Sequence, residues 1–124
     1  MEITPNIPQD RQVIESYGEG RFRISGAPYT GSVLVFPDRT IAWPVSRMED
    51  ISVGALSGVL DAEPRVEILL VGCGERLVPL SEDLRGPLRE KGIGCDAMDT
   101  GAACRTFNIL LAESRRVAAA LIAL

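Results

Sequence analysis

Gly72, Cys73 and Gly74 form a glycine-rich turn directly after the apolar run Val66 to Val71. Glycine lets a backbone turn tightly and approach a ligand closely, and the amides that such a turn exposes can bind an anion. The turn has no third glycine and no helix directly behind it, and it lacks the Gly-Lys-Ser/Thr of a phosphate loop, so neither nucleotide motif is present. A tight exit from a strand explains the same residues, so both interpretations stay open.

A second group of candidate residues lies between Met98 and Asn108. Small residues at 101–103 open a helix there, and a helix start presents unpaired N–H groups and the positive end of the helix dipole. Ligands of an α/β sheet bind at strand carboxyl ends beside helix starts, so we expect this helix start and the glycine turn to face each other across a cleft. The alternative is that small residues only permit close helix–sheet packing. The candidate ligand-binding residues are Gly72, Cys73, Gly74, Arg76, Asp99, Thr100, Cys104, Arg105 and Asn108.

Cysteine and acidic side chains offer further chemistry. Cys104 falls in the first turns of that helix, where the helix dipole lowers a thiol pKa, although a cysteine among alanine and phenylalanine is more often a buried hydrophobe. Asp96 and Asp99 flank a strand end and could serve as an acid–base pair, or be solvated charges. Three cysteines without a Cys-x-x-Cys pair give no zinc pattern or disulfide framework, so we expect no metal and no cofactor.

The chain contains no histidine. Ser-His-Asp and Cys-His catalysis are therefore excluded within the chain, as are histidine-ligated metals and histidine proton relays. Carboxylates, cysteine, lysine, tyrosine and arginine remain available, but no pattern among them assigns a catalytic residue. We expect that the protein is not an enzyme.

Length and charge limit the classes of protein to which the chain can belong. The 124 residues, 46% hydrophobic and 24% charged, fit one domain, which we place at residues 13–124 behind an extended arm at 1–12. The net charge of −4 argues against nucleic acid, because binding there depends on neutralising phosphates. No stretch reaches the roughly 20 apolar residues of a membrane helix, and the first ten residues lack the features of a secretory signal, so we expect a cytoplasmic bacterial protein.

The elements that would position these residues fall into two halves. Alternating or β-rich runs at Arg21–Ser25, Ser32–Phe36 and Ile41–Val45, separated by turn residues, predict an antiparallel β meander. A helix follows, with Ser52 as its N-cap and Glu63-Pro64 at its end.

The second half alternates strands and helices. We predict strands at 66–71 and 93–98, a short helix capped by Ser81, and a longer helix capped by Thr100. The longer helix has a core-facing stripe at Ala103, Phe107, Leu110, Leu111 and Ser114. The final run, Val117 to Leu124, suits either a continuing helix or a strand. This alternation predicts a mixed or parallel sheet with helices on its faces.

Several segments together resemble one small α/β family of unknown function. It includes the mitochondrial respiratory complex I assembly factor 3 and the adipogenesis-associated domain protein of animals, and the resemblance spans roughly residues 12–124. The resemblance implies a three-layer fold with a mixed central sheet, flanking helices and an additional β layer, and it implies that 117–124 is a strand. The matching segments are Ser16-Tyr17-Gly18, Tyr29-x-Gly31-Ser32-Val33, Phe36-Pro37-Asp38, Trp43, Gly72 to Leu77, Gly92 to Thr100, Ala103 to Leu110 and Glu113 to Leu121.

Two departures from the family pattern bear on function. Cys73 stands where the family often has threonine, and Phe107 stands where tyrosine is frequent, so a threonine-dependent ligand role and one phenol hydrogen bond are in doubt. The resemblance implies a non-catalytic assembly or interaction protein that supports a membrane-bound, respiratory-type complex from the cytoplasmic side. Its partners would be proteins, with a homodimer as one option. The alternative is a small-molecule or anion-binding protein, or an enzyme, that uses the cleft between residues 72–76 and 100–108.

Overall fold

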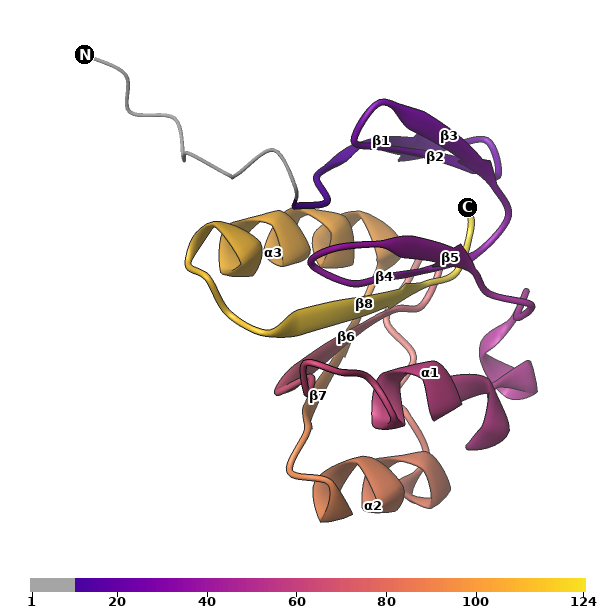
Figure 1. Cartoon of the computed structure of the whole chain (residues 1–124). Coiled ribbons are helices and arrows are strands. Elements are labelled where there is room, and N and C mark those ends of the chain that lie inside the picture. Colours follow the sequence, from indigo (N-terminus) through magenta and orange to yellow (C-terminus); the bar gives the residue numbers. More distant parts are fainter. Residues whose placement is uncertain (1–10) are drawn as a thin grey trace.

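The computed structural model describes residues 11–124, so nearly all of the arm predicted at 1–12 lies outside the described residues. The chain forms two β-sheets with helix α3 (Thr100–Ala112) packed between them (Figure 1). Helices α1 (Ser57–Leu60) and α2 (Glu82–Glu90) cover the other face of the larger sheet. The prediction of a mixed central sheet flanked by helices, with an additional N-terminal β layer, is confirmed.

The two sheets differ in size and direction. The small sheet is antiparallel in the order β1-β2-β3, and the larger sheet is mixed in the order β5-β4-β8-β6-β7. In the larger sheet β6 runs parallel to β7 and β8, whereas β4 runs antiparallel to β5 and β8. The strands are β1 (Ile14–Gly18), β2 (Arg21–Ile24), β3 (Ala27–Thr30), β4 (Val33–Val35), β5 (Thr40–Ala42), β6 (Ile68–Gly72), β7 (Gly94–Met98) and β8 (Val117–Leu121).

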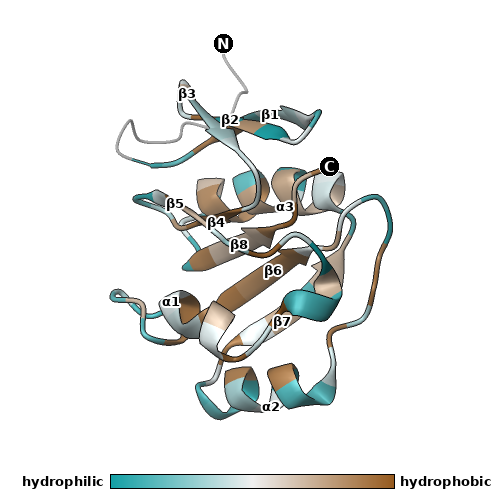
Figure 2. Cartoon of the chain, turned by 90° about the vertical axis from the view of Figure 1, so that its right-hand side faces the viewer, coloured by the Kyte–Doolittle hydropathy of each residue, from teal (hydrophilic) through white to brown (hydrophobic). Residues whose placement is uncertain are grey.

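Strand β8 lies at the centre of the larger sheet, and all five of its residues are buried. It is a strand, as the resemblance predicts, because β4 and β6 bond both of its edges and layers cover both of its faces. Its neighbour β6 divides the core by the two-residue period of a strand. Leu69 and Val71 face α1 and α2, whereas Leu70 faces α3. Figure 2 shows β6 in hydrophobic colours, with the hydrophilic residues of α2 turned outward.

Helix α3 packs on the sheet through the predicted stripe. Ala103, Phe107 and Leu111 are buried, but Ser114 lies beyond the helix end and is exposed. The N-cap is Asp99 and not Thr100, because the Asp99 side chain accepts the hydrogen bond from the Ala102 N–H.

Helix α1 is shorter than predicted, and two 3₁₀ turns precede it, η1 (Met48–Asp50) and η2 (Gly54–Leu56). Ser52 is not the N-cap of α1, which is Leu56, although its hydroxyl accepts the Ala55 N–H within the 3₁₀ turn η2. Ser81 precedes α2 as predicted, without a side-chain capping bond.

The first third of the chain is not one meander. Strands β1, β2 and β3 form the small sheet, whereas β4 and β5 form a hairpin at the edge of the larger sheet. Strand β1 escapes prediction because Ile14 is its one buried residue, so its sequence shows no alternation. Strand β5 ends at Ala42, before the predicted end at Val45. Among residues 11–124, no helix is long and apolar enough to cross a membrane.

Candidate functional site

The glycine turn and the start of α3 face each other, as predicted, and they are bonded directly. The Thr100 hydroxyl accepts a hydrogen bond from the Gly74 N–H at 2.9 Å and donates one to the Ile122 carbonyl at 2.8 Å. The Thr100 N–H donates to the Gly74 carbonyl at 2.9 Å. One buried threonine therefore joins three segments, namely the end of β6, the start of α3 and the end of β8.

The glycines of the turn permit this contact. A Cβ added at Gly72 would lie 3.0 Å from the Thr100 Cα and 3.0 Å from the Leu121 Cδ2, so no larger residue fits without movement of the backbone. Gly74 has a φ of +99°, a conformation that residues with a side chain rarely adopt. At Gly72, Gly74 and Thr100 the helix start and the strand end are therefore in direct contact.

The polar residues along α3 also bond within the chain. The Asn108 side chain accepts the Ile14 N–H at 3.0 Å and donates to the Ile14 carbonyl at 2.8 Å, so its amide pairs with β1 as a neighbouring strand would. Arg105 donates to the Tyr17 hydroxyl at 3.0 Å. A Cβ at Gly101 would lie 2.5 Å from that hydroxyl, so the glycine makes room for Tyr17. Together these contacts fasten the small sheet to α3.

The cysteines are free thiols, and two of them are strongly disposed to stay protonated. Burial raises the pKa of the Cys104 thiol to about 12, which outweighs the nearby Arg105 charge, and it raises the pKa of Cys95 to about 11. Cys104 is 2% exposed, so the helix start does not activate it. Cys73 is buried, and its thiol donates to the Val78 carbonyl at 3.3 Å.

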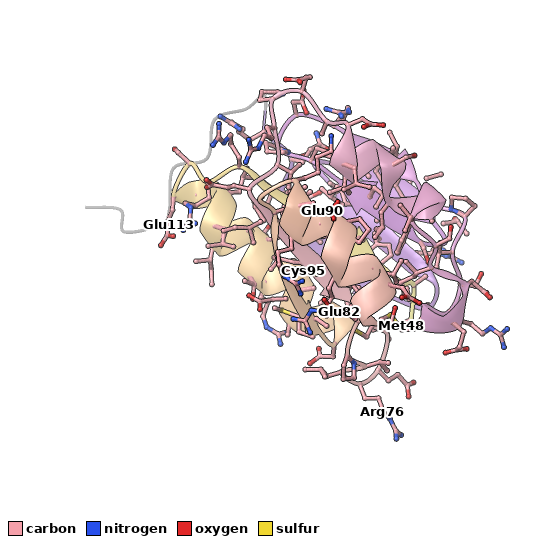
Figure 3. The ribbon with its side chains drawn as sticks, turned by 90° about the horizontal axis from the view of Figure 1, so that it is seen from below. Met48, Arg76, Glu82, Glu90, Cys95 and Glu113 are labelled. Atoms are coloured by element: carbon pink, nitrogen blue, oxygen red, sulfur yellow. The ribbon has the colours of Figure 1, made fainter. Side chains whose placement is uncertain are left out.

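Arg76 is the candidate residue that the fold leaves apart. It is exposed on the loop between β6 and α2, and Figure 3 shows it projecting outward from the end of that loop. Of the nine predicted residues, Gly72, Gly74, Asp99 and Thr100 come together at the helix start. Arg105 and Asn108 lie further along α3 against β1, and no three cysteine or acidic side chains in residues 11–124 gather as a metal-binding group.

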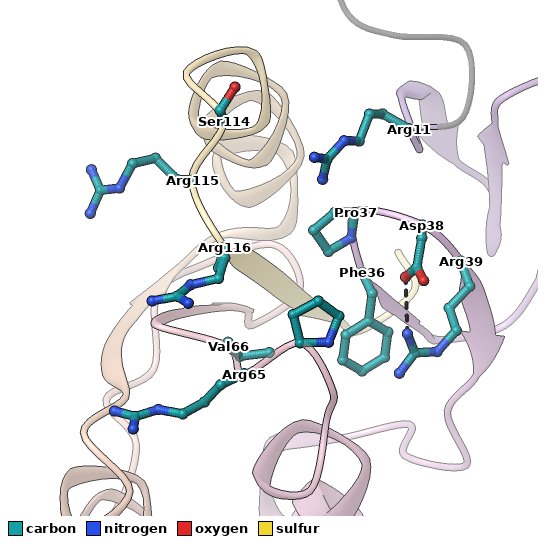
Figure 4. Close-up of a pocket in the computed structure, with 11 residues that line it drawn as sticks. Arg11, Phe36, Pro37, Asp38, Arg39, Arg65, Val66, Ser114, Arg115 and Arg116 are labelled. Atoms are coloured by element: carbon teal, nitrogen blue, oxygen red, sulfur yellow. Dashed lines mark hydrogen bonds and ion pairs between the residues drawn. The ribbon is translucent and has the colours of Figure 1, made fainter.

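The sequence reasoning missed a hollow at the opposite end of the larger sheet. Its volume is about 420 Å³, and it lies where β6 and β8 begin and where β4 turns into β5 (Figure 4). The adjacent pair Arg115 and Arg116 after α3 is the one sequence feature that could have indicated this hollow, because its other arginines are scattered along the chain. The lining residues are Arg11, Phe36, Pro37, Asp38, Arg39, Pro64, Arg65, Val66, Ser114, Arg115 and Arg116.

Arg115 and Arg116, at this end of the larger sheet, bind the carboxyl group of Glu67. A hydrogen bond from the Arg115 side chain and one from the Arg116 backbone N–H lower the pKa of the Glu67 carboxyl. The Arg115 Nε lies 2.9 Å from Glu67 Oε1, and the Arg116 guanidinium lies 3.6 Å from Oε2. Glu67 is thereby held as a carboxylate beside the hollow.

The family model for a protein of unknown function, DUF498/DUF598, matches residues 14–122. The chain belongs to this family. It is 39% identical over 109 residues to NADH dehydrogenase (ubiquinone) 1 alpha subcomplex assembly factor 3 of Xenopus tropicalis, which covers 88% of this chain and 60% of that protein. The human protein of the same name is 37% identical over 109 residues, covering 88% of this chain and 59% of that protein. The chain thus spans about three fifths of the length of these assembly factors.

Several bacterial proteins match this chain over a larger share of their own length. An uncharacterised protein of Rhodobacter capsulatus is 36% identical over 110 residues, covering 88% of this chain and 82% of that protein. A structure described as an outer membrane protein of Bartonella henselae superposes with a TM-score of 0.85 at 41% identity, covering 95% of this chain and 98% of that one. An Mth938-like domain of Bordetella pertussis gives 0.82 at 31% identity, covering 98% and 92%. The family and the fold that the sequence resembles are confirmed.

Proposed function

We propose that this chain is a non-catalytic assembly factor that binds protein subunits of a membrane-bound, respiratory-type complex from the cytoplasmic side. The observation that carries the proposal is the similarity to NADH dehydrogenase assembly factor 3, which extends over 88% of this chain at 39% identity in the frog protein. The family model matches residues 14–122, from the small sheet to the end of β8, so it includes every layer of the fold.

The geometry of the family's motif residues supports a role in shape. Thr100 and Asn108 each use donor and acceptor atoms on backbone groups of other segments, and Asp99 caps its own helix. Among the described residues, no buried side-chain nitrogen or oxygen lacks a hydrogen-bond partner. Because these side chains bond to the backbone of the chain itself, they serve to hold the three layers together.

A surface of fixed shape is what an assembly factor offers its partners. Among the described residues, seven large apolar side chains are exposed, and four of them lie in two regions. Tyr17 at 40% and Ile109 at 59% lie on β1 and on α3, which contact each other, and Leu77 at 58% and Val78 at 37% lie on the loop after β6. Exposed apolar residues that gather at one place supply the contact energy of protein interfaces. These two places are therefore where we would introduce charges to map the partner.

The test is a pull-down of the tagged chain from the organism that encodes it, after membranes are dissolved in a mild non-ionic detergent. We expect mass spectrometry to identify subunits of the membrane-bound NADH dehydrogenase, enriched over a tagged protein of similar size and charge. If the partner binds at one of these two places, Leu77→Asp or Ile109→Asp should abolish the recovery of those subunits. Circular dichroism checks that each variant is folded. Recovery of the chain without any subunit of that complex would contradict the proposal.

A further inference from the structure

The hollow at the start of β6 and β8 collects arginine in a chain that is acidic overall. Five of the twelve arginines line it, although the net charge of the protein is −4. Asp38 is the one acidic residue of the lining, and it lies 2.9 Å from Arg39. Among residues 11–124, no carboxylate lies within 4.0 Å of the guanidinium groups of Arg11 or Arg65. The hollow therefore carries a net positive charge.

The end of helix α3 explains only part of this charge. A helix C-terminus attracts cations, and Arg115 and Arg116 follow it directly. Arg11, Arg39 and Arg65 come from three other segments that line the same hollow, and the Arg65 guanidinium lies at its outer side against Gly92. Figure 4 shows the Arg11 side chain reaching toward the end of α3 at Ser114. The arginines thus stand on more than one side of the hollow.

The floor of the hollow is apolar. Phe36, Pro37, Pro64 and Val66 contribute to the lining. Phe36 is buried beneath the Arg39 guanidinium, which stacks 4.2 Å from the centre of its ring, and Val66 is buried as well, so Pro37 and Pro64 supply the accessible apolar surface. A volume of about 420 Å³ lies in the range of small-molecule sites, which typically run from about 300 to 1,000 Å³. A ligand that fits both features has a charged end and a small apolar body.

We propose that this hollow binds a small organic phosphate monoester, with the phosphate held by arginine and the organic group on Pro37 and Pro64. A carboxylate ligand needs only one guanidinium, which it binds through two parallel hydrogen bonds. A phosphate monoester has three terminal oxygens and a double charge, so it can bind several guanidinium groups at once. Arg115 and Arg116 are held by Glu67 in exposed ion pairs, and such pairs cost little to exchange for an incoming anion. This inference does not rest on the proposed assembly role.

The test is a titration of the ¹⁵N-labelled protein with phenyl phosphate, inorganic phosphate and phenol, followed by amide chemical shifts. We expect saturable shifts from phenyl phosphate at residues 36–39, 65–67 and 114–116. Inorganic phosphate should bind at least about threefold more weakly, because it lacks the apolar group, and phenol should not saturate. Shifts that are spread over the surface, or that do not saturate, would overturn the proposal and leave the pull-down result unaffected.

Variants separate this hollow from other basic places. Arg11→Ala and Arg116→Ala should each weaken phenyl phosphate binding about five- to tenfold, the usual loss of one exposed charged contact. Arg89→Ala, which removes an arginine paired with Glu82 on α2, should leave the affinity unchanged. Glu67→Gln should tighten binding, because it removes the negative charge that competes with the incoming anion for Arg115 and Arg116. Weaker binding in Arg105→Ala, with no change in Arg11→Ala, would place the anion in the predicted cleft and overturn this site.

A lipid headgroup can present the same chemistry as a free phosphate monoester. Sedimentation with vesicles of phosphatidylcholine that contain phosphatidic acid distinguishes the two sources. Binding of phenyl phosphate without sedimentation supports a free organic phosphate as the ligand. Sedimentation that Arg11→Ala and Arg116→Ala abolish, and that Arg89→Ala does not, supports the same site with a lipid headgroup in it.

Discussion

Replacing Thr100 by valine tests whether this residue fastens the three segments that meet at the start of α3. Valine has nearly the shape of threonine, so the change removes the hydroxyl and leaves the packing in place. The side chain of Thr100 is fully buried, and its hydroxyl is bonded to the Gly74 N–H at 2.9 Å and the Ile122 carbonyl at 2.8 Å. Both backbone groups would lose this partner inside the core.

The expected loss follows from the cost of burying an unpaired polar group. Each such group costs about 1–3 kcal/mol, and the two groups here share one site, so we expect Thr100→Val to lower the free energy of unfolding by about 2–4 kcal/mol. Thr106→Val is the matched control on the same helix. Thr106 is partly exposed, and its side chain makes no hydrogen bond to any of residues 11–124, so its replacement should change stability by less than about 0.5 kcal/mol.

Urea unfolding followed by circular dichroism measures both variants, and hydrogen exchange at the Gly74 amide reports on the bond itself. We expect the urea midpoint to fall for Thr100→Val at an unchanged slope, and the Gly74 amide to exchange faster. Equal stability of Thr100→Val and the wild type, with unchanged exchange at Gly74, would refute the reasoning. It would show that the contact at the helix start does not depend on the hydroxyl.

Three other predictions follow from the same contacts. Asn108→Ala should lower the free energy of unfolding by about 1–3 kcal/mol and speed exchange at the Ile14 amide, measured by urea unfolding and NMR, because both bonds to β1 are lost. Gly72→Ala should lower the free energy of unfolding by about 1–3 kcal/mol, since its Cβ would lie 3.0 Å from the Thr100 backbone. The control is Gly86→Ala in α2, whose Cβ meets nothing within 4 Å and which should raise the free energy of unfolding by up to about 1 kcal/mol. Thermal unfolding of the two variants measures the difference. Burial raises the pKa of the Cys104 thiol to about 12 from an ordinary value of 9.0, so the thiol loses its proton more readily in the unfolded chain. The free energy of unfolding should therefore fall as the pH rises above about 9. Cys104→Ala should reduce that fall, measured by urea unfolding at about pH 8 and about pH 10. An unchanged slope with pH in that variant would contradict the assignment to Cys104.

Most of the fold could be predicted from local pattern. The stripe at Ala103, Phe107 and Leu111 and the apolar run that becomes β6 have the periods of a helix and a buried strand. The final strand could not be assigned in this way. The run 117–121 has alanine at three of five positions and suits a helix by propensity, but its place between β4 and β6 makes it a strand. That choice came from the family resemblance.

The sequence predicts where in the fold the glycine turn and the helix start lie, but not the contacts between them. The glycine turn and the helix start meet because parallel strands end at one edge of a sheet, which chain order alone predicts. Whether they meet across a cleft or in direct contact depends on distances of a few tenths of an ångström at Gly72 and Thr100, which residue types do not encode. The sequence does not reveal the arginine-lined hollow because its lining comes from four separate segments, and among its arginines only Arg115 and Arg116 are adjacent in sequence.

Deletion of the gene in the organism that encodes this chain tests the assembly role most directly. Membranes are separated on native gels, and the amount of assembled NADH dehydrogenase is measured by its activity in the gel and by its subunits. We expect loss of the full complex with partly assembled forms in its place, and recovery when the wild-type chain is supplied. A full amount of active complex in the deletion strain would contradict the proposed function.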